Sequence, residues 1–103
     1  MTQFAVFRNP RRTEFLPFLL QIQTSRLDRS SVRVVMPLMQ RSSAAPADAA
    51  LTPHLVVQGI AVWADPMNLA TVQRRLLGSE LEILADPDQD RIIRAIDELI
   101  SRG

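Results

Sequence analysis

The 103-residue chain contains no cysteine, no lysine and no tyrosine, and it has one histidine and three glycines. Without cysteine, disulfides, thiolate metal ligands and cysteine nucleophiles are all excluded. A single histidine without cysteine does not supply the ligands of a zinc site. Three scattered glycines do not form a Gly-rich phosphate loop. We therefore expect no metal or cofactor, and we expect a protein suited to a reducing cytoplasm.

Long apolar segments are also missing. The opening residues 1–12 lack the apolar run of roughly 7 to 15 residues that a signal peptide needs. No stretch approaches the ~18 apolar residues required to cross a membrane as a helix. The sequence predicts a cytoplasmic protein that makes no membrane contact.

Charge is balanced, but every basic residue is arginine: 12 basic and 11 acidic residues give a net charge of +1. Arginine without lysine suits bidentate recognition of phosphate or carboxylate groups, but GC-rich coding, which the many alanines support, is the favoured explanation. Two clusters, Arg8 with Arg11 and Arg12, and Arg74 with Arg75, are either solvated loop charge or contacts for RNA or an acidic partner. Balanced total charge argues against a general nucleic-acid coat, and we expect no direct sequence-specific nucleic-acid binding.

Apolar, β-branched runs separated by turn signals predict a mainly antiparallel β domain that spans residues 1–103. Pro17 is expected at a strand start, a bulge or an edge, because proline cannot donate to a strand ladder. Gln58-Gly59 predicts a hairpin turn within 54–64. Segment 41–50 is an exposed loop or a short frayed helix, and 65–78 is either strand or helical turn. The expected strands are 3–7, 16–24, 31–39 and 54–64.

One terminal helix is predicted over about 87–101. Asp86 is a suitable N-cap and Pro87 fits the first helical position. Isoleucine and leucine then recur at helical spacing and form one apolar stripe, at positions 92, 93, 96, 99 and 100. The carboxylates at 86, 88 and 90 lack the later glycine and glutamate of a calcium loop, so they are interpreted as compensation of the helix dipole.

Catalytic candidates are few. His54 follows Pro53 at the start of a predicted strand, and the sequence places neither a nucleophile nor an orienting carboxylate beside it. It is interpreted as a surface or half-buried structural residue. We expect a protein that acts by binding and is not an enzyme.

Taken in order, several segments resemble the CcdB family of bacterial toxin–antitoxin toxins. "QFAVF" (3–7) resembles the opening Gln-Phe-x-Val-aromatic strand of that family, and Gln23 and Asp28 fall where it has glutamine and aspartate after its second strand. "RVVMPL" (33–38) looks like its Arg-x-Val-Ile-Pro-Leu strand, and "IIRAID" (92–97) is similar to its Ile-x-x-Ala-Ile-Asn helix. Further matches in register are Pro53, Gly59, Trp63 and Met67. The resemblance extends over nearly the whole chain.

The resemblance implies an SH3-like barrel, shared with toxins similar to MazF, with a small extra sheet and one C-terminal α-helix, assembled as a homodimer. It also implies a plasmid-maintenance toxin that binds the DNA gyrase A subunit and inhibits this type II topoisomerase by trapping the cleaved-DNA complex. A CcdA-like antitoxin would neutralise it through a disordered segment. Two alternatives stay open: an mRNA endoribonuclease similar to MazF, because fold alone does not fix function, and a degenerate member that poisons nothing.

The implied gyrase contact lies at the chain end, where the best-known member has Phe-Trp-Gly-Ile and this sequence has "ISRG" (100–103). The anchoring tryptophan is absent, and loss of such an anchor commonly costs ~2 kcal/mol or more. Arg102 is a candidate replacement, because a guanidinium stacks on flat groups and pairs with carboxylates. The candidate gyrase contacts are Arg26, Leu27, Asp97, Ile100, Ser101, Arg102 and Gly103. The candidate antitoxin contacts are Arg8, Arg11, Arg12 and Arg41.

Overall fold

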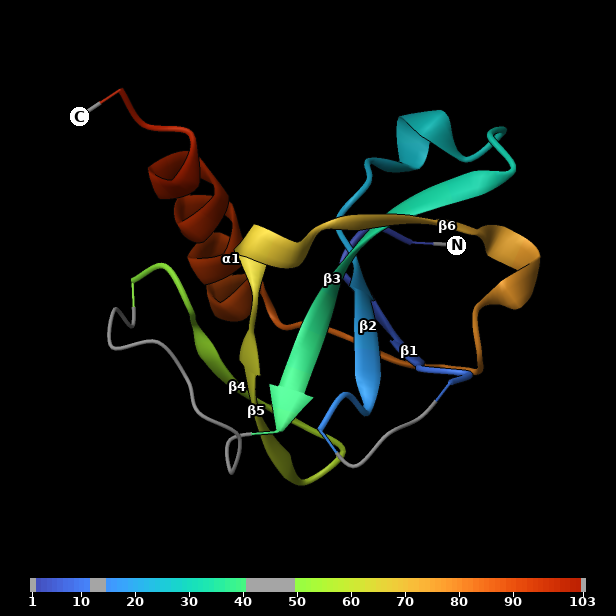
Figure 1. Cartoon of the computed structure of the whole chain (residues 1–103), viewed down its shortest axis with the longest axis horizontal. Helices are drawn as coiled ribbons and strands as arrows, with labels where there is room; N and C mark the ends of the chain where they lie inside the picture. Colours follow the sequence, from blue (N-terminus) through green and yellow to red (C-terminus); the bar gives the residue numbers. More distant parts are fainter. Residues whose placement is uncertain (1, 12–14, 41–49, 103) are drawn as a thin grey trace.

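The computed structural model describes residues 2–11, 15–40 and 50–102, and within them an antiparallel sheet curls into a half-barrel beside one C-terminal helix (Figure 1). This is the fold class that the sequence predicts. The order along the sheet is β4-β5-β3-β2-β1-β7, and β6 pairs with β3 outside this order. The elements are β1 Ala5–Arg8, β2 Phe18–Gln21, η1 Ser25–Leu27, β3 Val32–Gln40, β4 His54–Val57, β5 Ile60–Ala64, η2 Pro66–Asn68, β6 Ala70–Gln73, η3 Arg74–Leu76, β7 Glu80–Ile83 and α1 Asp86–Leu99.

Strand β3 is the longest described strand and has three partners. One edge pairs with β2, while the other edge pairs first with β6, over Val32–Val35, and then with β5, over Leu38–Gln40. Pro37 lies between these two stretches, and its carbonyl accepts a hydrogen bond from the Asp65 N–H at 3.1 Å. A proline, which has no N–H to donate, is therefore placed where β3 changes partner.

Hydrogen bonds join the β4–β5 hairpin to β7, at the other end of the strand order. At the β4–β5 turn, the backbone N–H and the side-chain amide of Gln58 both donate to Glu82 Oε1 on β7, at 2.9 and 3.3 Å. Gln58 and Gly59 have φ of 52° and 76°, so both central residues of this turn lie in the left-handed region that a two-residue hairpin requires. The predicted Gln58-Gly59 hairpin is confirmed, and its turn helps to close the half-barrel.

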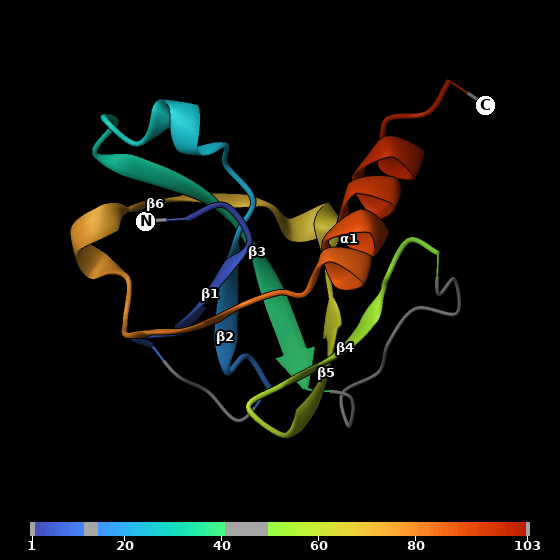
Figure 2. The same cartoon turned by 180° about the vertical axis from the view of Figure 1, so that it is seen from behind.

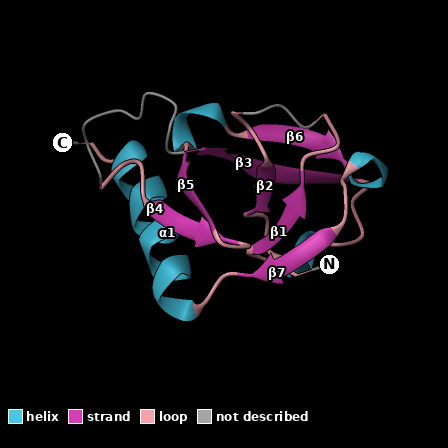
Figure 3. Ribbon diagram, turned by 90° about the horizontal axis from the view of Figure 1, so that it is seen from below, coloured by secondary structure: helices cyan, strands magenta, loops and turns pink. Residues whose placement is uncertain are grey.

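A single apolar core fills the half-barrel and includes Phe18, Leu20, Met36, Leu38 and Val62. Helix α1 contributes Ile92 to this core and also buries Ala95. The helix lies beside the β4–β5 end of the sheet, with its C-terminal end directed away from it (Figures 2 and 3). The predicted apolar stripe is therefore divided, because Ile93, Leu99 and Ile100 stay exposed.

Several element bounds differ from the sequence expectations. The segments predicted at 3–7, 16–24, 31–39 and 54–64 correspond to β1, β2, β3 and the β4–β5 hairpin. The ambiguous 65–78 segment contains both kinds of structure, because β6 lies between the η2 and η3 turns. Strand β7 was not predicted. The helix begins at Asp86 with Ala85 as its N-cap, so the expected Asp86 cap is wrong, and the Gln89 amide donates to the Leu84 carbonyl at 2.8 Å instead.

Gly78 is required by a close approach between chain segments. A Cβ at this position would lie 2.3 Å from the Arg8 carbonyl oxygen, where the end of β1 meets the entry to β7. The Arg8 N–H donates to the Ser79 carbonyl at 2.9 Å in the same place.

The described helix α1 is too short and too polar to cross a membrane.

Candidate functional site

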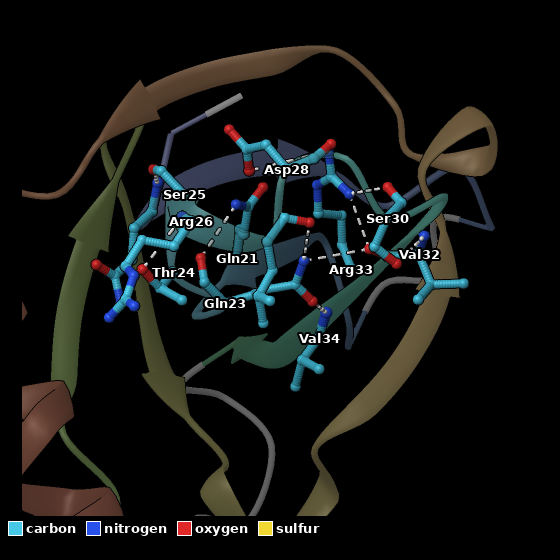
Figure 4. Close-up of polar contacts among 12 residues, drawn as sticks. Gln21, Gln23, Thr24, Ser25, Arg26, Asp28, Ser30, Val32, Arg33 and Val34 are labelled. Carbon is cyan, nitrogen blue, oxygen red and sulfur yellow. Dashed lines mark hydrogen bonds and ion pairs between the residues drawn. The ribbon is translucent and has the colours of Figure 1, made fainter.

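The turn between β2 and β3 is held by the buried side chain of Gln23 (Figure 4). Its Nε2 donates to the carbonyls of Leu27 and Val32, each at 3.3 Å, and its Oε1 accepts the Val34 N–H at 3.1 Å. One amide therefore joins the η1 turn to the start of β3. This explains the position of Gln23 two residues after β2, where an apolar side chain would leave the turn carbonyls without these donors.

Arg33 supports the same turn from within the protein, with only 1% of its surface exposed. Its Nη1 donates to the carbonyls of Ser30 and Val32 at 2.6 and 2.8 Å, and its Nη2 donates to the Asp28 carbonyl at 3.0 Å (Figure 4). The Asp28 carboxylate lies 3.9 Å from Nη2. Burial of a guanidinium is costly unless its donors find acceptors, and here both terminal nitrogens do, whereas the buried Nε has no hydrogen-bond partner among the described residues. Arg33 is not among the predicted site residues, although a charged residue inside an apolar β-branched run is a visible signal in the sequence.

The supported turn displays two of the predicted gyrase contacts. Arg26 is exposed, and its backbone N–H is capped by Thr24 Oγ1 at 3.3 Å. Leu27 is 55% exposed even though its carbonyl is held by Gln23. A large apolar side chain on a fixed, solvated turn is well suited to anchor a partner.

The other predicted gyrase contacts lie at the end of α1. Asp97, Ser101 and Arg102 are exposed, and Ile100 is 72% exposed. The N–H of Ile100 donates to the Ile96 carbonyl at 3.2 Å, and the N–H of Ser101 donates to the Glu98 carbonyl at 3.3 Å. Backbone hydrogen bonds therefore continue beyond the helix as far as Ser101. Gly103 lies outside the described residues.

The structure does not bring these two groups together within one chain. In Figures 1 and 2, both the η1 turn and the end of α1 lie in the upper part of the molecule, but at opposite sides of it. A single contact surface that includes both Leu27 and Ile100 therefore requires a second chain or a partner that spans both sides.

Arg8 and Arg11 lie at a turn fixed by Asn9. The Asn9 Oδ1 accepts the Arg11 N–H at 3.1 Å, and its Nδ2 donates to the Leu16 carbonyl at 2.9 Å. Asparagine favours turns because its side chain replaces a backbone partner in this way. Both arginines are exposed. Arg12 and Arg41, the other predicted antitoxin contacts, lie outside the described residues.

His54 is exposed at the start of the edge strand β4, opposite Trp63 of β5. The described ranges contain no group of three or more His, Cys, Asp or Glu side chains placed to hold a metal ion. What the described surfaces present are exposed cations, such as Arg8, Arg11 and Arg26, and exposed apolar side chains, such as Leu27 and Ile100.

These features define a small antiparallel half-barrel on which the η1 turn and the end of α1 each expose a large apolar side chain, Leu27 and Ile100. The family model described as CcdB protein matches residues 3–102, and the chain therefore belongs to the CcdB family. A comparison with curated protein sequences finds no match.

Solved structures that are similar in fold include two endoribonucleases. An endoribonuclease in complex with its cognate antitoxin, from Mycobacterial species, is similar with a TM-score of 0.79 at 12% identity, covering 100% of this chain and 97% of that one. Another endoribonuclease from Mycobacterial species has a TM-score of 0.72 at 12% identity, covering 95% and 88% respectively. At this identity the likeness concerns the fold alone.

Proposed function

We propose that this protein is the toxin of a toxin–antitoxin system that binds the DNA gyrase A subunit and traps its cleaved-DNA complex. The observation that supports this most directly is the end of α1 in a CcdB-family chain: Ile100 is 72% exposed on a helix end that extends away from the sheet. Such a toxin acts by binding and needs no chemistry of its own. We place it in the cytoplasm, where gyrase acts, with plasmid maintenance as its role.

A homodimer is part of this proposal. The η2 turn contacts α1, and exposed apolar side chains in this region are Met67 on the turn, Leu69 directly after it and Leu99 on the helix. Exposed apolar side chains on neighbouring elements are typical of a surface that another chain covers. A two-fold dimer would also present two helix ends to a symmetric target. Sedimentation of the purified protein should give twice the monomer mass, and Met67→Asp should shift it towards the monomer.

The gyrase contact is proposed to combine the η1 turn, through Arg26 and Leu27, with the end of α1. The helix end would contribute Asp97, Ile100 and the last three residues, Ser101, Arg102 and Gly103. Without the tryptophan of the best-known member, Ile100 supplies the apolar anchor and Arg102 supplies a planar cation that stacks or pairs with a carboxylate.

A gyrase supercoiling and DNA-cleavage assay tests this contact. Full-length protein should inhibit supercoiling and accumulate linear DNA, and a version lacking residues 101–103 should not. Arg102→Ala should weaken inhibition about tenfold, equivalent to ~1.4 kcal/mol. Arg91→Ala, an exposed helix arginine outside the proposed contact, is the matched control. Equal potency of the full-length and truncated proteins would show that the helix end is not the contact.

The antitoxin is proposed to be an acidic, disordered segment that folds onto Arg8, Arg11, Arg12 and Arg41. Exposure of Arg8 and Arg11 on a fixed turn supports this, because pre-organised cations lose little entropy on binding. Calorimetric titration with a polyglutamate peptide should show affinity about tenfold weaker for Arg8→Gln/Arg11→Gln than for wild type, and unchanged for Arg91→Gln/Arg94→Gln. Equal losses in both double variants would mean that only net charge matters.

An mRNA endoribonuclease is the second candidate, because two of the solved structures that are similar in fold are described as endoribonucleases. Incubation of the purified protein with total RNA separates the two functions. A gyrase poison leaves the RNA intact, whereas an endoribonuclease gives discrete fragments without gyrase. Intact RNA together with normal supercoiling would identify a member that poisons neither target.

A further inference from the structure

An open groove of about 870 Å³ lies between the turn that precedes β3 and the η3 turn that follows β6. The β3–β6 ladder continues into it, because Val32 pairs with Gln73 and the Arg74 N–H donates to the Ser31 carbonyl at 2.9 Å. Its walls therefore extend a paired sheet and are fixed relative to each other. The lining residues are Asp28, Arg29, Ser30, Ser31, Val32, Gln73, Arg74, Arg75, Leu77 and Gly78.

The side chains in this groove are mainly hydrogen-bond donors. Arg29, Arg74 and Arg75 approach it from both walls, and two serine hydroxyls and one glutamine amide accompany them. Asp28 is the single acidic residue in the lining, and its carboxylate lies 3.9 Å from the buried guanidinium of Arg33. The charge of Asp28 is thus balanced from inside the protein, and the groove keeps an excess of positive charge.

Charge is separated along the chain even though the net charge is only +1. From Glu80 onward the sequence holds seven acidic residues and three arginines, whereas the lining of the groove holds three arginines and one aspartate. A polyanion is therefore attracted to the groove and repelled by the α1 half of the molecule. This separation of charge orients a bound polyanion, whereas a uniformly basic surface would bind it in any orientation.

We propose that this groove binds the phosphodiester backbone of a nucleic acid without reading its base sequence. Guanidinium groups pair bidentately with phosphates, and serine and glutamine side chains are common partners of phosphate oxygens. The lining contains no aromatic residue on which a base would stack, so sequence selection is not expected. An acidic peptide suits the groove less well, because Val32 and Leu77 are its only large apolar lining side chains and both are half-buried.

The groove is distinct from the proposed gyrase and antitoxin contacts, but it lies beside one of them. Asp28 and Arg29 directly follow Leu27, so a partner held at Leu27 would bring its own bound DNA to the groove entrance. Phosphodiester binding by the groove does not depend on gyrase binding, and it is measured without gyrase.

Fluorescence anisotropy of the full-length protein tests the inference with labelled single-stranded DNA and RNA of one sequence, each about 20 nucleotides long, between 50 and 200 mM salt. If the three arginines neutralise three phosphates, a plot of the logarithm of the binding constant against the logarithm of the salt concentration should have a slope of about −2 for single strands. Affinity should therefore fall roughly 20-fold over this range. Arg29→Gln/Arg75→Gln should reduce the slope to about −0.7, and Arg29→Lys/Arg75→Lys should preserve it. Arg91→Gln/Arg94→Gln on α1 is the matched control and should bind like wild type.

All variants should show the same thermal melting as wild type, so that a change in binding reports on the groove. Equal binding of DNA and RNA that is lost in Arg29→Gln/Arg75→Gln supports a site for the phosphodiester backbone that both nucleic acids share. Tighter binding of DNA or of RNA shows which of the two is the ligand. Loss of binding in the α1 control alone overturns the assignment of the site, as does salt-independent binding. Polyglutamate binding that is lost in Arg29→Gln/Arg75→Gln, without nucleic-acid binding, overturns the ligand class and makes this a groove for an acidic protein segment.

Discussion

Replacing Arg33 with methionine should loosen the turn that carries Leu27. The substitution keeps most of the buried apolar stem but removes three hydrogen bonds from the guanidinium to the carbonyls of Asp28, Ser30 and Val32. Hydrogen bonds to charged groups are each worth about 1.5–3 kcal/mol. The variant also avoids burying a cation, and water can reach the freed carbonyls of an exposed turn, so the losses do not add fully. We expect a net loss of about 3 kcal/mol from a total of roughly 5–15 kcal/mol.

Urea unfolding and amide hydrogen exchange measure this effect. A loss of about 3 kcal/mol lowers the melting temperature of a domain of this size by roughly 12–24 °C. Exchange of the Leu27 and Asp28 amides, which donate to Thr24 and Ser25, should rise more than exchange in β1 and β2. Arg29→Met on the same turn is the exposed control and should stay within about 0.5 kcal/mol of wild type. A loss below about 1 kcal/mol for Arg33→Met would refute a supporting role for the guanidinium.

Three further substitutions test the packing. Ile92→Ala removes a fully buried side chain and should lower the free energy of unfolding in urea by about 2–5 kcal/mol. Ile93 is 45% exposed, so Ile93→Ala should lower it by less than ~1 kcal/mol, and equal losses would contradict the helix orientation. Gly78→Ala places a Cβ against the Arg8 carbonyl and should cost about 1–3 kcal/mol, and a neutral result in thermal melting would contradict this close approach. Glu82→Ala removes the acceptor at the β4–β5 turn, so amides of the hairpin should exchange faster while those of β2 remain protected.

Much of the architecture follows from local patterns in the sequence. The Gln58-Gly59 pair predicts a hairpin because glycine accepts a positive φ, and the structure confirms that turn. The spacing of Ile92 and Ile96 predicts the final helix, because an amphipathic stripe at that period suits no strand. Family membership is also confirmed, since the order of the quoted segments agrees with a family match over residues 3–102.

The missed features depend on contacts between distant segments. Strand β7 was overlooked although "ELEI" (80–83) alternates polar and apolar residues, because the segment is only four residues long and glutamate is disfavoured in strands; it is stabilised as a strand by pairing with β1. The expected Asp86 cap failed because the chain enters α1 one residue earlier, from Ala85. The sequence did not predict which candidate site residues lie close together. Only the folded structure shows that the η1 turn and the end of α1 are apart.

The sequence by itself determined the family, the antiparallel β class, the position of the terminal helix and the absence of cysteine chemistry, because composition and periodicity are local properties. Only the tertiary structure decided that Arg33 is buried beneath the η1 turn and that Arg29, Arg74 and Arg75 meet in one groove. The physical reason is that β3 pairs with β6 across some forty intervening residues. This pairing joins segments whose charges have no visible relation along the chain.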